Sequence, residues 1–437
     1  MAKKAYAVAA TLAVAAVALS GCSSSGSSDN SLDGTPKGTI TVLTNRTDRV
    51  KDGTYKKYAE AFQKKYPGTT VKFQALDGYD DAMKTRLNGT KYGDVLMIPA
   101  QVKPSQFSQF FVPLGKTSDF EKTYQWTQKA TFDGKQYGIS VGGAANGMIY
   151  NKKVFKEAGI TTLPKSESEW IDDLKLIKSK TSAIPYYTNY KDGWPLGQAN
   201  GNIGAITNDV QAQITMAENP APWTKGTDIY ALDSLVFETV KAGLSEPDPL
   251  STDWETSKTD FASGKIAAMS LGSWAVSQMQ AAADKVGASK DDIGYMAWPS
   301  NKDGKQYAIT DGDYSQAISK HSTNKATALA WIKFFTADSG AAENEGMINA
   351  VVGAKQPGYV TDLTDAGVTL ITPALAPEGK DSLLKDTANE AGIDLFGQVY
   401  RQKLIDVARG AADGTKDSYF AQLNDKWAAA VKKLGSK

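Results

Sequence analysis

Short strand-like runs alternate with helical patterns in the first hundred residues, and this alternation constrains the fold more than any other feature. Residues 39–44 (TITVLT) form an expected strand, and residues 55–66 place apolar side chains on one face of a helix that Pro67-Gly68 ends. A strand at 70–75, a short helix at 81–87 and a strand at 94–98 follow. This order is typical of parallel βαβ units, in which ligands bind beyond the carboxyl ends of the strands. The sequence therefore predicts an α/β fold.

The chain is long enough for two such units. It has 437 residues, of which 41% are hydrophobic, so it can bury two separate cores. Its 49 basic and 48 acidic residues give no reason to expect a nucleic-acid partner. Cys22 is the one cysteine, which excludes an intramolecular disulfide.

The amino terminus predicts export and anchoring. Lys3 and Lys4 precede an apolar run at 6–19, and Leu19-Ser20-Gly21-Cys22 resembles the bacterial lipobox, in which cleavage precedes a cysteine that is then lipidated. We expect a signal peptide at 1–21 and a lipidated, Ser-rich tether at 22–36, which would hold the protein on the outer face of the cell membrane. The alternative is an ordinary secretory signal with an incidental cysteine.

A second unit is expected to begin near residue 139. Ser166 and Glu169 form a predicted capping box for a helix that carries Trp170. Further on, a strand at 265–271 leads into a helix whose expected cap is Ser273. Trp274 then lies at a strand-to-helix junction, where open α/β sheets place ligands.

Three segments carry a resemblance to a known family. They are GMIYNKKVFKEAGI at 147–160, FASGKIAAM at 261–269 followed by Gly272-Ser273-Trp274, and ISKHSTNK at 318–325. In this order they resemble the extracellular solute-binding proteins of ABC importers, in the large sugar-binding family that includes maltose-binding protein. The resemblance implies a sugar receptor with no catalytic residues and no cofactor or metal. Its expected partners are a carbohydrate and the transmembrane subunits of a permease, and it is expected to be a monomer.

The resemblance also implies a two-lobed fold of the type II periplasmic-binding-protein kind, with a hinge of several chain crossings. We expect lobe 1 to contain residues 37–143 and 299–340, and lobe 2 to contain residues 144–298 and 341–437. The crossings are expected near 139–144, 298–299 and 337–345.

A sugar needs an aromatic platform for its apolar face and planar polar groups for its hydroxyls. Trp274 matches the family's stacking tryptophan, with interdomain packing as the alternative. The aromatic loop 186–195 adds Trp194, Tyr186 and Tyr190 as candidates, although loop aromatics also cap cores. Six other tryptophans are expected to pack, namely Trp170, Trp223, Trp254, Trp298, Trp331 and Trp427.

Three charged residues are candidates for hydroxyl recognition. Arg46 and Asp48 follow the first strand, where the alternative is a solvated surface pair. Asp313 lies in DGDY at 311–314 and could accept paired hydrogen bonds, with a tight Asx turn as the alternative.

Two other functions fit parts of the sequence. A tethered glycoside hydrolase would need a carboxylate pair, for which Asp80-Asp81 or Asp253 with Glu255 are possible. A ferric-ion or other small-solute binding protein of the same fold could use adjacent phenolates, for which Tyr186-Tyr187 is the candidate pair.

Overall fold

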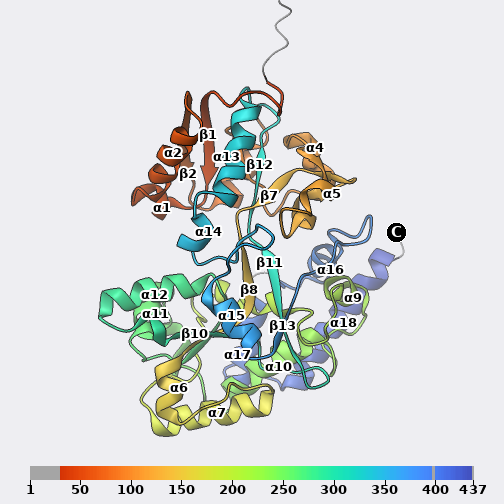
Figure 1. Ribbon diagram of the computed structural model, residues 1–437. Helices are drawn as coiled ribbons and strands as arrows, with labels where there is room; N and C mark the ends of the chain where they lie inside the picture. The colour runs from red at the N-terminus through yellow and green to blue at the C-terminus, as the bar shows by residue number, and fades with distance from the viewer. Residues whose placement is uncertain (1–29, 396–398, 436–437) are drawn as a thin grey trace, which may run out of the picture.

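The computed structural model describes residues 30–395 and 399–435 and divides them between two lobes (Figure 1). Each lobe has its own mixed sheet, and a third, three-stranded sheet is small. The expected signal peptide, Cys22 and the first part of the tether lie outside the described residues. Within the described ranges, no helix combines the length and the apolar character needed to cross a bilayer.

Lobe 1 is built on five strands in the order β2-β1-β3-β12-β7. Strand β1 (Gly38–Thr44) is parallel to β2 (Thr69–Ala75) and β3 (Val95–Met97), as the alternation predicted. The later strands β12 (Ser315–Ile318) and β7 (Gly138–Ser140) are antiparallel additions. The carboxyl ends of β1, β2 and β3 consequently meet at one edge of the sheet.

Helices cover this sheet, and the expected apolar face of the first long helix is confirmed. Tyr55, Tyr58 and Phe62 of α2 (Thr54–Lys65) are buried, and the Phe62 ring lies 5.4 Å from that of Trp331 on α13 (Lys325–Ala337). The other helices and short strands of this part of the chain are α1 (Thr47–Lys51), α3 (Tyr79–Arg86), α4 (Phe107–Phe110), α5 (Thr117–Phe120), α14 (Ala341–Asn344), β4 (Gly115–Lys116), β5 (Thr131–Phe132) and β6 (Lys135–Gln136).

Lobe 2 is organised by the long strand β8 (Gly143–Asn151). It pairs antiparallel with β9 (Ala268–Gly272), β10 (Ile293–Met296) and β11 (Gln306–Gly312), and β13 (Val368–Ile371) is parallel to β11. The surrounding helices are α6 (Lys152–Ala158), α7 (Glu167–Lys180), α8 (Trp194–Gly197), α9 (Ala212–Glu218), α10 (Asp228–Lys241), α11 (Trp254–Ala262), α12 (Ala275–Val286), α15 (Gly358–Asp365), α16 (Leu383–Ala391), α17 (Val399–Arg409) and α18 (Lys416–Gly435).

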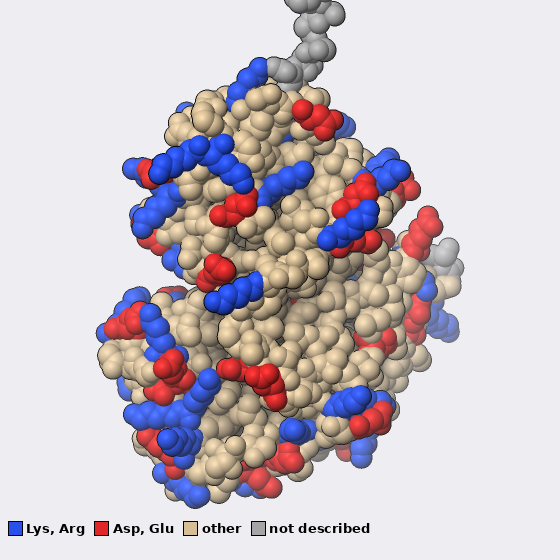
Figure 2. Space-filling view, viewed as in Figure 1, with Lys and Arg blue, Asp and Glu red and all other residues tan. Residues whose placement is uncertain are grey.

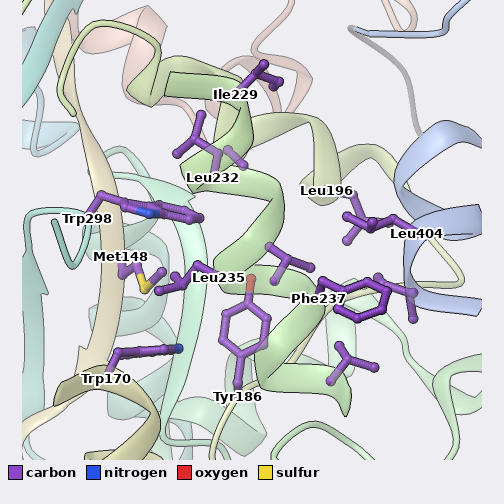
Figure 3. Close-up of a cluster of buried hydrophobic side chains, with 14 of the residues drawn as sticks. Met148, Trp170, Tyr186, Leu196, Ile229, Leu232, Leu235, Phe237, Trp298 and Leu404 are labelled. Atoms are coloured by element: carbon purple, nitrogen blue, oxygen red, sulfur yellow. The ribbon is translucent and has the colours of Figure 1, made fainter. Parts of the chain in front are cut away.

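A large apolar core packs around α10 in this lobe (Figure 3). It buries Trp170, Trp223, Trp298 and Trp427, which confirms the packing role expected for them. The expected capping box of α7 forms only in part. Ser166 accepts from the Glu169 amide at 3.2 Å, but the Glu169 carboxylate accepts from the Lys165 amide, one residue before the cap.

The strand pairing corrects the expected lobe boundaries. Strand β11 belongs to the lobe 2 sheet, so the boundary before residue 299 is wrong, and the chain crosses at 313–314 instead. Ala341 on α14 packs in the lobe 1 core, so the last crossing begins after residue 345. The first crossing, at 141–142, lies within the expected range. The expected boundary near residue 299 came from the family resemblance alone, and only the pairing of β11 with β8 and of β12 with β3 places the crossing between these two strands.

Candidate functional site

Trp274 lies between β9 and α12, at the junction where it was expected. Ser273 does not cap the helix, contrary to the sequence prediction. Its buried hydroxyl accepts from the Ala145 amide and donates to the Tyr359 hydroxyl, each at 2.9 Å. Because the hydroxyl faces the sheet, Trp274 itself occupies the cap position, and no side chain caps the helix there.

Three tryptophan rings meet at this junction, and we call them the tryptophan platform: Trp194, Trp254 and Trp274. The Trp194 centroid lies 5.1 Å from that of Trp254 and 5.9 Å from that of Trp274, and the last two are 5.9 Å apart. Each spacing lies within the range of favourable aromatic contacts. Trp194 is 40% exposed, so the platform keeps an open aromatic surface.

Two polar neighbours orient the platform. The Trp274 indole nitrogen donates to the Gln198 side-chain oxygen at 3.3 Å. The Lys258 ammonium lies 5.3 Å from the Trp254 ring centroid, within cation–π range. The rings are therefore fixed by hydrogen bonding and charge as well as by packing.

Trp274 also lines a cavity of about 650 Å³ between the lobes. Figure 2 shows the corresponding indentation between the two lobes, on the side of α1 and α12. Acidic and basic side chains are interspersed on the face shown. Polar side chains of both lobes line the cavity, namely Asn45, Arg46, Asp48, Arg49, Glu255, Lys258, Thr259, Ser277, Gln278, Lys285, Asp313 and Glu345.

On the lobe 1 side, Arg46 and Asp48 form a two-pronged ion pair, with nitrogen–oxygen distances of 2.9 and 2.7 Å. The pair is not isolated at the surface, because Glu345, only 7% exposed, accepts from Arg46 at 2.5 Å and contacts Arg49 at 2.7 Å. Burial alone would lower the pKa of Arg46, but the bonds and charges of Asp48 and Glu345 outweigh it and raise the pKa. Burial would raise the pKa of Asp48, and the bond from Arg46 lowers it instead. Both groups are thus charged at neutral pH.

Asp313 lines the same cavity at the crossing between β11 and β12. One of its carboxylate oxygens accepts from the Tyr314 amide at 2.8 Å, and its own amide donates to the Gly142 carbonyl at 2.8 Å. The bond goes to the next residue and not two residues on, so it is not the Asx turn weighed as the alternative, and the exposed Asp313 side chain lines the cavity.

Tyr186 does not reach the cavity, and its expected ligand contact is wrong. It is 3% exposed and packs edge-on against Trp170 in the lobe 2 core. Tyr190 does not line the cavity either. Its hydroxyl donates to the Asp406 carboxylate at 2.9 Å, which ties the loop to α17.

The phenolate pair required for iron binding is not assembled. Tyr186 packs in one core, while Tyr187 packs against a different one and accepts from the Asp253 amide at 2.9 Å. Burial raises the pKa of both phenols, which disfavours phenolate. Among the described residues, no group of three or more His, Cys, Asp or Glu side chains could hold a metal ion.

The carboxylates considered for hydrolysis have local structural roles. Asp253 caps α11 by accepting from the Thr256 amide at 2.7 Å, and the hydrogen bonds from Thr256 keep its pKa below the usual value. Glu255 pairs with Lys258 at 2.8 Å, and Asp81 pairs with Lys84 at 2.8 Å. A proton donor needs a raised pKa, which Asp253 does not have.

Sequence reasoning missed two members of the site. Trp254 packs against a lobe 2 core as expected, and the start of α11 also brings its ring against Trp274, which was not expected. Glu345 carried no sequence signal, because its partner Arg46 is 299 positions away. For Trp254, the preceding Asp253 offered a signal, since an aspartate cap places the next side chain at a helix mouth.

Two α/β lobes around a cavity, with crossings between them, define a protein of the class that closes on a ligand by hinge bending. The model of the bacterial extracellular solute-binding proteins matches residues 47–342, and the chain belongs to that family. The multiple sugar-binding protein of Streptococcus mutans is 24% identical over 331 residues, which cover 73% of this chain and 75% of that protein.

Two solved structures from Bifidobacterium animalis subsp. lactis are more similar. An ABC-transporter binding protein in complex with mannobiose is 40% identical, with a TM-score of 0.82 over 91% of this chain and 95% of that one. A manno-oligosaccharide-specific solute-binding protein in complex with mannotriose is 36% identical, with a TM-score of 0.81 and the same coverage. The similarity spans both lobes and the hinge.

Proposed function

We propose that this protein is the sugar receptor of an ABC importer and that its ligands are manno-oligosaccharides. The tryptophan platform beside the interlobe cavity is the observation that carries the proposal, because stacked indoles suit the apolar face of a pyranose ring. The two Bifidobacterium relatives with mannobiose and mannotriose support the choice of ligand.

The opposite side of the cavity fits the hydroxyl rim of such a ligand. Arg46, Asp48 and Asp313 present charged donors and acceptors there, and charged groups form stronger hydrogen bonds to neutral hydroxyls than neutral groups do. We infer that the protein binds and releases its ligand unchanged, because Asp253 and Glu255, the pair considered for hydrolysis, are engaged in a helix cap and an ion pair. It acts without a cofactor.

The protein works outside the cell, as its family does. We further propose that Cys22 carries the lipid that anchors it to the membrane, and that as a monomer it delivers the sugar to the transmembrane subunits of the permease. Cys22→Ser should move the protein from the membrane fraction to the medium, which immunoblotting of the two fractions would detect. A Cys22→Ser protein that stays with the membrane after removal of residues 1–21, as its mass would show, would contradict the anchor.

A thermal-shift screen tests the ligand class. Mannobiose and mannotriose should raise the melting temperature, since a ligand at one hundred times its Kd stabilises the folded state by about 2.7 kcal/mol. Maltose, raffinose and chitobiose serve as competing candidates in the same plate. The proposal of a sugar receptor fails if no saccharide raises the melting temperature. The proposal of manno-oligosaccharides as ligands fails if only a saccharide without mannose raises it. Release of free mannose from mannotriose over time would contradict the absence of catalysis.

A further inference from the structure

A fully buried arginine bonds to the segment that follows Trp194 of the tryptophan platform. Arg401 on α17 is 0% exposed, and each of its three side-chain nitrogens has an acceptor. We propose that Arg401 is a positioning residue that fixes the platform in its ligand-binding geometry. The inference rests on the proposed function, since it assigns the platform to a ligand.

Two of the three contacts go to the segment that carries the platform. One terminal nitrogen donates to the Leu196 carbonyl at 2.8 Å, and Leu196 lies in α8, which begins at Trp194. The other donates to the Asn200 side chain at 2.7 Å. Between these two positions lies Gln198, which accepts from the Trp274 indole. The guanidinium thus bonds to the chain on both sides of Gln198, the residue that accepts from Trp274.

The same helix holds the other end of this segment. Gln402 donates to the Tyr190 carbonyl at 2.7 Å, and the Tyr190 hydroxyl donates to Asp406. Trp194 is therefore bracketed by α17 contacts on both sides in sequence. A second set of bonds ties the same loop to the start of α11, where the Lys191 amide donates to the Thr252 hydroxyl and the Trp254 amide donates to Asp192, each at 2.7 Å.

The third nitrogen pairs with Asp233 on α10 at 2.8 Å. Asp233 is also 0% exposed and accepts from the Trp223 indole at 2.8 Å, so the pair is fully coordinated in the core. Burying an ion pair brings little net stability compared with apolar packing. What the arginine adds is a planar fork whose three nitrogens reach three separated acceptors, whereas the three donors of a lysine all radiate from a single nitrogen.

Fluorine NMR of the fluorotryptophan-labelled protein, together with calorimetry, tests the proposal. Trp194, Trp254 and Trp274 are assigned among the nine tryptophans by single replacements with phenylalanine. Arg401→Lys keeps the charge but loses the fork. Asn200→Ala removes one acceptor and leaves the Arg401–Asp233 pair intact. Ile177→Ala, in the same core on α7, is the matched control for lost packing.

We expect the platform resonances of the ligand-free protein to shift or broaden in Arg401→Lys and Asn200→Ala and to stay in place in Ile177→Ala. Affinity for mannobiose should fall about three- to tenfold in the first two variants and should not change in the control. If Arg401→Lys does not fold, the platform resonances and the mannobiose affinity of Asn200→Ala decide whether the proposal holds.

Unchanged platform resonances and unchanged affinity in folded variants would overturn the proposal. Resonances that shift equally in Ile177→Ala would also overturn it, because the effect would then be a general loss of packing. If the unaltered protein binds no saccharide, the proposed function fails, and the resonances alone decide whether Arg401 positions the platform.

Discussion

Replacing Trp274 with alanine removes the platform member that lines the interlobe cavity directly. The change removes the proposed stacking surface for the sugar and two ring contacts, to Trp194 and Trp254, each at 5.9 Å. One aromatic contact contributes about 0.5 to 1.5 kcal/mol beyond area burial, and loss of a central interface tryptophan costs more. We therefore expect a loss of about 1 to 3 kcal/mol in binding, or roughly a five- to 150-fold higher Kd.

Isothermal titration with mannobiose and mannotriose measures this loss. Trp274→Phe keeps a ring and should recover part of the affinity. Trp331→Phe is the matched control, because Trp331 lies in the lobe 1 core and its indole nitrogen has no hydrogen-bond partner to lose. It should leave the Kd unchanged.

The reasoning is refuted if Trp274→Ala, shown to be folded by a cooperative melting transition, binds both saccharides with the original Kd. The cavity would then take its ligand at another surface. A loss of affinity equal to that of Trp331→Phe would also refute it, since a core substitution would then be enough to explain the effect.

Other substitutions probe the charged rim and the buried polar groups. Glu345→Gln should lower the free energy of unfolding by about 1 to 3 kcal/mol in urea titrations, because Arg46 loses a buried, charged partner. Burial raises the pKa of Glu246 to about 7, so the folded state binds its proton more tightly and stability is lost as pH rises from about 4.5 to 7. Glu246→Gln, which can still accept from Thr188, should remove roughly 3 kcal/mol of that decline, measured as the difference between the two unfolding profiles. An identical pH profile would contradict this assignment. Tyr186→Phe should leave the Kd for mannobiose unchanged, and ferric salt should give no visible absorption band with either protein.

Local patterns predicted the elements whose contacts are close in sequence. Strands β1 and β2 and helix α2 follow directly from apolar periodicity, because each buries a face against its neighbours. Trp274 was placed correctly because a strand end and a helix start adjoin it in the chain. The family resemblance added the two lobes, which periodicity alone does not determine.

Contacts between distant segments could not be predicted in this way. Tyr186 reads as a loop aromatic, yet its amide donates to the Leu244 carbonyl and the chain there is drawn into the core. Glu345 and Arg401 lack any local motif, and their roles come from partners far away in the chain. Strand β11 was assigned to the wrong lobe because only its partner β8 reveals which sheet it extends.

The two sides of the cavity differ in the contacts that fix their side chains. On one side these contacts lie within lobe 2, and on the other they lie next to the hinge. In lobe 2, the platform is fixed by packing and by the Arg401 contacts within that lobe alone, so it is complete whether or not the lobes approach each other. In lobe 1, Arg46 is held by Glu345, the residue that directly precedes the last crossing of the hinge. A sugar that stacks on lobe 2 therefore meets a preformed surface, which lowers the cost of the first contact. Under the proposed function, closure of the hinge would bring these charged groups onto a ligand that lobe 2 has already oriented.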